Sequence, residues 1–268
     1  MKKLLVTVAS VTLTAMLASP GQAQMRGKYS GGMGGHVVER RDYDVRATDL
    51  APAFPDSHAC DPVASPYGSP HRHDGSVRRQ DRNSGLHGGL DISLVEGTPL
   101  LAIAAGKVIA KGEGGNLEGF YLWMLHAPED TGLTFWSFIK YQHLVALPAV
   151  NPGDRVSAGQ VVAHSGMSGT IGPAFGPQGY PHLHVSLHVA PGPGFDQQGT
   201  SNSFMPPKSG KLADPMLMFL PADRDFARVE DLPAAEKRLP VAALARDGRI
   251  HPAGSKVVWP VFCSASAG

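Results

Sequence analysis

The stretch His182-Leu-His-Val-Ser-Leu-His-Val189 has the pattern of a β-strand with one apolar and one polar face. Successive side chains of a strand point to opposite sides of its sheet, so residues two apart share a face. His182 and His184 are therefore predicted to point the same way. The opposite face is apolar and is predicted to be buried. Its residues are Leu183, Val185 and Leu187.

Short apolar runs separated by Gly, Pro, Asn and Asp extend over the chain from about Cys60 to Leu220. This texture predicts an all-β fold, a compact antiparallel β-sheet domain with long loops. The other predicted strands are Pro99 to Ile103, Lys107 to Lys111, Phe120 to Leu125, Trp136 to Leu144 and Val161 to Ala163. A few short helices are predicted at the C-terminal end, over Asp223 to Arg228 and Leu232 to Leu239.

The first residues have the features of a cleaved secretory signal. Lys2 and Lys3 precede an apolar run, and small residues lead up to Ala23. The alternative, an anchoring helix, needs roughly 20 apolar residues, whereas this run is shorter and is followed by Pro20. We therefore predict a signal peptide over residues 1–23, a periplasmic or secreted protein, and no membrane span in the mature chain.

The mature chain divides into three parts by composition. Residues 24–59 are rich in Gly, Arg and Asp and lack apolar periodicity, which predicts a flexible N-terminal arm. Residues 60–220 carry the predicted strands, and residues 221–268 are predicted to be a C-terminal extension that packs on that domain.

Charge and cysteine content narrow the class of function. Loss of Lys2 and Lys3 with the signal leaves 24 − 2 = 22 basic against 23 acidic side chains. A nearly neutral chain argues against binding nucleic acid through bulk charge. An exported chain meets an oxidising compartment, so we predict a disulfide between Cys60 and Cys263. The alternative is two separate thiols, because the sequence does not show whether their Cα atoms approach each other.

A second cluster, His87-Gly-Gly-Leu-Asp91, precedes the histidine pair. Gly88 and Gly89 disfavour a helix, and a four-residue offset keeps His87 and Asp91 on one face of an extended chain. Catalytic zinc takes three ligands from His, Asp and Glu and keeps a fourth position for water. His87, Asp91 and a strand histidine would satisfy that requirement. The alternative is an ordinary hydrogen-bonded pair beside two surface histidines.

These residues resemble the lysostaphin-type (LytM-like) zinc metallopeptidases, a family of peptidoglycan endopeptidases, over about Tyr67 to Val189. The family's landmarks follow in the same order along this chain. They resemble His87 to Asp91, Gly97-Thr98-Pro99 with Ala102, Gly106-Lys107-Val108, Tyr141-Gln142-His143-Leu144, Gly153 to Gln160, Gly166 to Gly169, and His182-Leu183-His184.

The resemblance implies that residues 60–220 are a metallopeptidase domain with an active-site groove and one zinc ion per chain. It implies that His87, Asp91 and His184 are the zinc ligands, and that His143 and His182 are the two catalytic histidines beside the metal-bound water. A helical His-Glu-x-x-His motif is missing from the sequence, so histidine rather than Glu is the expected base. Which histidine takes the proton stays open.

Three features depart from the family pattern. An excursion over Ala127 to Phe135 and a lengthened loop over Gly172 to Pro181 are both expected to border the groove. Ser186 stands where the family usually carries Glu, so a contact behind the metal ligands is either missing or replaced.

The leading hypothesis is a zinc metalloendopeptidase that hydrolyses the peptide cross-links of peptidoglycan. One alternative is a catalytically silent relative that activates another cell-wall hydrolase. Such relatives typically lack one or more ligands, whereas this chain has all three. The other alternative is a secreted protease that acts on protein substrates.

Overall fold

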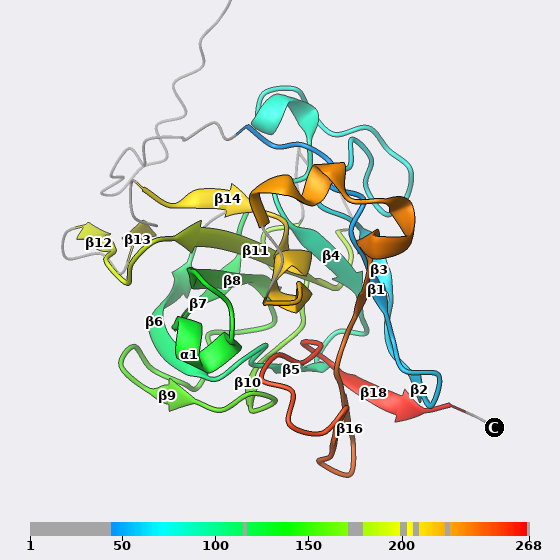
Figure 1. Ribbon diagram of the computed structural model, residues 1–268. Helices are drawn as coiled ribbons and strands as arrows, with labels where there is room; N and C mark the ends of the chain where they lie inside the picture. The colour runs from blue at the N-terminus through cyan, green and yellow to red at the C-terminus, as the bar shows by residue number, and fades with distance from the viewer. Residues whose placement is uncertain are drawn as a thin grey trace, which may run out of the picture. The chain divides into compact units, whose positions relative to one another are not determined.

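An eight-stranded sheet forms the centre of the computed structural model (Figure 1). All of its neighbouring strands run antiparallel, which confirms the predicted all-β class. In order across the sheet they are β3 (Val63–Ser65), β4 (Leu90–Ser93), β11 (His182–Ala190), β8 (Trp136–Leu144), β7 (Phe120–His126), β6 (Gly106–Glu113) and β9 (Arg155–Val156). The eighth strand, β14 (Lys211–Ala213), pairs with the part of β11 that lies beyond β4.

The structure describes residues 44–114, 117–170, 179–198, 203–205, 209–222 and 226–266. The predicted signal peptide, the first part of the predicted arm and most of the lengthened loop lie outside these residues. All of the described residues belong to one compact unit.

The central strand β11 has the two faces that its sequence predicts. Leu183 and Leu187 are 0 % exposed and Val185 is 1 % exposed, and all three lie in the main hydrophobic core. Burying a side chain of this size contributes roughly 2 kcal/mol. The apolar face therefore anchors the strand, and its histidines are held on the opposite face.

A bulge interrupts the pairing of β7 with β8. Phe120 lies opposite Leu144 and Leu122 lies opposite Tyr141, so β8 has one more residue than β7 between these pairs. His143 lies at the bulge and has a left-handed backbone, with φ of 62°. Tyr141 and Leu144 both remain in the core. The extra residue therefore lets His143 point to the same side as the histidines of β11.

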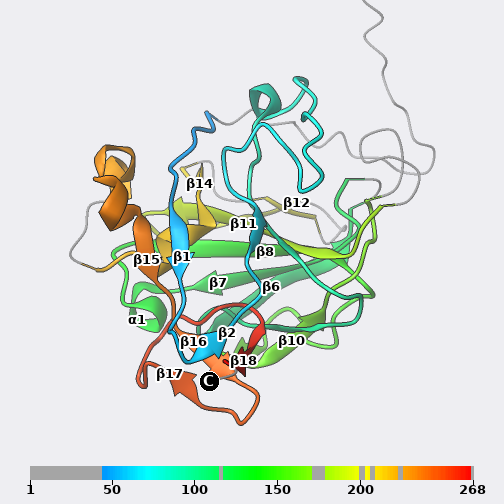
Figure 2. The ribbon, with the colours of Figure 1, turned by 90° about the vertical axis from the view of Figure 1, so that its right-hand side faces the viewer.

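The N-terminal and C-terminal parts of the described chain lie side by side (Figure 2). An arm is expected over residues 24–59, but the described part of this segment, residues 44–59, contains the two short strands β1 and β2. The smaller sheets pair β1 (Ala51–Ala53) with β15 (Arg238–Pro240), β5 (Pro99–Leu101) with β10 (Val161–His164), and β12 (Asp196–Gln198) with β13 (Ser203–Met205). The last sheet has the order β17 (Ile250–His251), β16 (Ala243–Ala245), β18 (Phe262–Ala265) and β2 (His58–Ala59). Cys60 and Cys263 form the predicted disulfide.

In the described residues, the one α-helix is α1 (Pro128–Thr131), which begins with a proline and ends at Gly132 with a left-handed backbone. The C-terminal helices are of the 3₁₀ type. The 3₁₀ helices are η1 (Asn83–Gly85), η2 (Pro215–Phe219), η3 (Phe226–Asp231) and η4 (Ala234–Lys237). Across the described part of the chain, no helix has the length and apolar character that a membrane crossing requires.

The excursion that contains α1 does not border the histidine cluster, so this expectation is wrong. It joins β7 to Trp136 at the start of β8, and Trp136 lies opposite Ala190. Ala190 is six residues along β11 from His184, which is about 20 Å in a strand. The excursion therefore lies at the far end of the sheet.

Candidate metal centre

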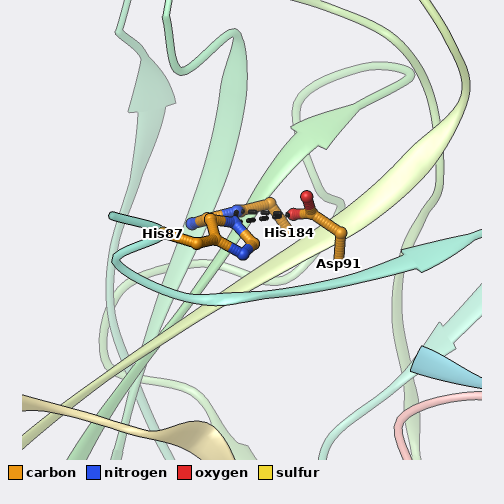
Figure 3. Close-up of side chains that lie close together, drawn as sticks. All are labelled: His87, Asp91 and His184. Carbon is orange, nitrogen blue, oxygen red and sulfur yellow. Dashed lines mark hydrogen bonds and ion pairs between the residues drawn. The ribbon is translucent and has the colours of Figure 1, made fainter. Parts of the chain in front are cut away.

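Asp91 and His184 lie directly opposite each other on the paired strands β4 and β11. Nδ1 of His184 is 2.8 Å from Oδ1 of Asp91. His87 precedes β4, and its Nε2 lies 3.2 Å from the same oxygen and 3.1 Å from Nδ1 of His184. Figure 3 shows the three side chains converging, and one donor atom from each lies within 4.8 Å of the others.

Gly89 allows the His87 segment to approach β11 closely. A Cβ atom at this position would lie 2.4 Å from the carbonyl oxygen of Val185 and 2.5 Å from Nε2 of His184. Both distances are far below van der Waals contact, so any larger residue would push the segment away from the strand. Gly89 thus serves the geometry of the cluster as well as disfavouring a helix.

Contacts behind the two histidines fix which ring nitrogen faces the cluster. Nδ1 of His87 donates a hydrogen bond to the carbonyl oxygen of Pro66 at 3.0 Å, so its Nε2 carries the lone pair. Nε2 of His184 lies 3.0 Å from Oγ of Ser186. With Nδ1 of His184 as a metal ligand, Nε2 carries the proton and donates it to this hydroxyl. Ser186, which stands where the family usually carries Glu, therefore supplies a hydroxyl contact behind the ring of His184.

The second carboxylate oxygen of Asp91 has its own partners. A guanidinium nitrogen of Arg78 lies 3.3 Å from Oδ2, and the hydroxyl of Tyr180 donates to the same oxygen at 3.4 Å. The same nitrogen of Arg78 also donates to Oγ of Ser65 at 2.8 Å. Both ends of the Asp91 carboxylate are thus engaged.

His143 and His182 lie beside this cluster and are buried, at 3 % and 1 % exposed. Their ring centroids are 4.5 Å apart. Nδ1 of His143 donates to the carbonyl oxygen of Ser168 at 2.9 Å, and Nδ1 of His182 donates to that of Tyr180 at 3.0 Å. Nε2 of His182 lies 3.7 Å from Oδ1 of Asp91, so this nitrogen faces the cluster.

Burial sets the protonation of the cluster. It lowers the pKa of His184 to about 4, lowers the pKa of His182, and holds the pKa of His143 well below its usual value. Burial alone would raise the pKa of Asp91, but the adjacent His87 and His184 hold it well below the usual carboxyl value. His143, His182 and His184 are therefore neutral at pH 7, and the carboxylate of Asp91 is ionised.

This donor set fits a zinc ion. Zinc binds neutral imidazole and carboxylate, whereas calcium and magnesium prefer oxygen ligands alone. The set offers Nε2 of His87, Nδ1 of His184 and Oδ1 of Asp91. Three protein donors leave room for a water molecule, as in catalytic zinc sites.

The structure brings together all five residues that the sequence singles out. They are His87, Asp91, His143, His182 and His184. Sequence reasoning missed Arg78 and Tyr180. Arg78 belongs to a polar run that shows no periodicity, and the lengthened loop before His182 was the one signal that pointed towards Tyr180.

Comparison with known proteins places this cluster within a family. Residues 85–198 match the model of peptidase family M23. Among solved structures, the lysostaphin catalytic domain from Staphylococcus simulans is 25% identical, with 58% of this chain and 89% of that chain covered and a TM-score of 0.39. LytU is 24% identical, with 66% and 96% covered and a TM-score of 0.39.

A zinc-containing peptidase from Vibrio cholerae is 22% identical, with 56% of this chain and 37% of that chain covered and a TM-score of 0.36. The family assignment comes from the sequence match, which spans the five candidate residues from His87 to His184. Residues 85–198 of this chain are therefore a domain of peptidase family M23.

Proposed function

We propose that this protein is a zinc-dependent endopeptidase that hydrolyses the peptide cross-links of bacterial peptidoglycan. The observation that carries the proposal is the convergence of His87, Asp91 and His184 inside an M23 domain. The family supports peptidase activity, and the donor set supports zinc. The wall substrate follows from the resemblance of residues 67–189 to the lysostaphin-type peptidases.

The residues around the cluster supply proton transfer. When bound, zinc would polarise the scissile carbonyl and lower the pKa of a water molecule. His143 and His182 each donate from Nδ1 to a backbone carbonyl, so Nε2 is the basic nitrogen of each ring. One of them can take the proton of the attacking water and pass it to the leaving amine. The other, once protonated, can stabilise the oxyanion.

The disulfide supports the proposed location outside the cytoplasm. Disulfides persist in secreted and periplasmic proteins and are rare in the cytosol. Cys60 and Cys263 are joined in this way. Peptidoglycan is exposed to proteins in the same compartments.

The test uses the chain without residues 1–23, stripped of metal and then given zinc. We expect about one zinc per chain, as for a catalytic site of this type, and cleavage of defined cross-linked peptidoglycan fragments detected by mass spectrometry. Asp91→Asn and His87→Ala should each lose zinc. His164→Ala is the matched control, because His164 is exposed on β10, outside the cluster.

Other outcomes would redirect the proposal. Full zinc occupancy in both Asp91→Asn and His87→Ala would show that the ligand set is wrong. A wild-type protein that binds zinc but cuts no fragment would instead favour a silent regulator of another hydrolase. Cleavage of unstructured protein at the same rate as wall fragments would favour a general secreted protease.

A further inference from the structure

The two carboxylate oxygens of Asp91 face different partners. Oδ1 lies 2.8 Å from His184, 3.2 Å from His87 and 3.7 Å from His182. Oδ2 instead faces Arg78 at 3.3 Å and Tyr180 at 3.4 Å. The carboxylate is thus oriented, with one oxygen for the histidine cluster and one for two hydrogen-bond donors.

Arg78 is held in this position at a cost to folding. Its side chain is 14% exposed, so a charged group is largely removed from water. Its Nε is buried and has no hydrogen-bond partner among the described residues. An apolar side chain of similar size commonly stabilises a fold as well as a buried charge does. Packing alone therefore does not account for an arginine here, whereas its contacts with Asp91 and Ser65 do.

The ring and the hydroxyl of Tyr180 make different contacts, so a substitution can remove one and keep the other. Its ring is stacked between those of His73 and His182, at centroid distances of 3.5 Å and 4.1 Å. Its hydroxyl donates a hydrogen bond to Oδ2 of Asp91 at 3.4 Å. Replacement by phenylalanine would keep the stack and remove only the donor.

We propose that Arg78 and Tyr180 are positioning residues that hold Oδ2 of Asp91 and thereby turn Oδ1 towards His87 and His184. Without them the carboxylate gains rotational freedom, which metal binding must then remove. They therefore set the affinity of the site for zinc. This inference rests on the proposed function, because it takes Asp91 to be a zinc ligand.

The test measures the zinc dissociation constant of Tyr180→Phe and Arg78→Met by competition with a chelator. Loss of a partner behind a metal ligand typically weakens metal binding by about 10-fold to 100-fold, and we expect a rise within that range for each variant. Removing the positive charge of Arg78 would by itself tighten the binding of a dication. Weaker binding by Arg78→Met would therefore identify positioning and not charge.

Two matched controls make the same chemical changes away from Asp91. Arg79→Met removes an exposed arginine that pairs with Asp81, and Tyr67→Phe removes a hydroxyl that donates to the carbonyl oxygen of Leu212. Neither should change zinc affinity. Thermal unfolding of the metal-free proteins identifies a variant that fails to fold. If Arg78→Met fails to fold, Tyr180→Phe tests the inference by itself.

The role of each residue is overturned if its variant, folded, binds zinc as tightly as the wild type. Failure of the proposed function looks different. In that case His87→Ala would also bind zinc as the wild type does, or the wild type would not bind zinc at all.

Discussion

The imidazole rings of His143 and His182 lie 4.5 Å apart, although the register of β8 and β11 pairs His184 with Gln142. The bulge at His143 produces this contact, because the extra residue turns His143 out of the alternating pattern. Both rings are buried beside the candidate ligands. The pair is therefore placed to move protons for the proposed reaction at a metal held by His87, Asp91 and His184.

We expect His143→Ala and His182→Ala to lower kcat on cross-linked fragments, each by about 10²-fold to 10⁴-fold, the usual contribution of a general acid or base. Zinc content should stay near that of the wild type, because the three proposed ligands remain. Turnover and bound zinc are measured on the same preparations. Turnover at the wild-type rate in either variant would exclude that histidine from proton transfer.

We expect Gly89→Ala to lose zinc affinity and stability together. The added Cβ would meet the carbonyl oxygen of Val185 and the ring of His184, and overpacking of this kind costs about 1–3 kcal/mol. Zinc titration and urea unfolding measure the two effects. Gly192→Ala is the control, since a Cβ there meets no atom within 4 Å. Equal zinc affinity in Gly89→Ala and Gly192→Ala would mean that zinc binding does not need the close approach of the His87 segment to β11.

Folding stability should depend on the protonation of His126. Burial lowers its pKa to about 4 from 6.5. The folded state therefore binds fewer protons than the unfolded state between these values, so stability is full above pH 6.5 and falls as the pH drops towards 4. The shift corresponds to about 3 kcal/mol.

The measurement compares urea unfolding of the wild type and His126→Gln across this pH range. Taking the difference between the two proteins removes the contribution of Asp214, whose pKa burial raises to about 6 and which acts in the opposite sense. We expect the wild type to lose its advantage over the variant on acidification. If the unfolding free energies of the two proteins change in parallel with pH, the protonation of His126 does not affect stability and the prediction is wrong.

Loss of the disulfide should destabilise the fold. The bond joins residues that are 203 positions apart, and closing so long a loop removes much of the entropy of the unfolded chain. We expect Cys60→Ala with Cys263→Ala to lower the free energy of unfolding by about 3–5 kcal/mol. Reductant should have a similar effect on the wild type and none on the double variant. If reductant does not change the free energy of unfolding of the wild type, the prediction is wrong.

The sequence predicted much of the sheet because alternation leaves a clear pattern. Leu183 and Val185 could be assigned to the core, and His184 to the opposite face, from their order alone. The same rule places His143 on the wrong face. Tyr141 lies in the core, so strict alternation would send His143 there as well, and only the bulge corrects it.

Arg78 and Tyr180 were not predictable for a different reason. Each reaches Asp91 from a loop, and no periodic pattern tells which loop side chain turns inward. The α1 excursion was misplaced because the sequence gives its length but not which end of the sheet it joins. The C-terminal helices proved to be short 3₁₀ turns, in a region where Pro233 and neighbouring prolines interrupt the chain.

Strand β18 pairs with β16 on one side and with β2 on the other. A chain that ends before Phe262 would therefore leave two strand edges without partners at once. Trimming of only residues 262–266 would also remove Cys263 and with it the disulfide to Cys60. This short segment therefore joins the N-terminal strand β2 to the C-terminal strand β16 both by backbone hydrogen bonds and by a covalent bond.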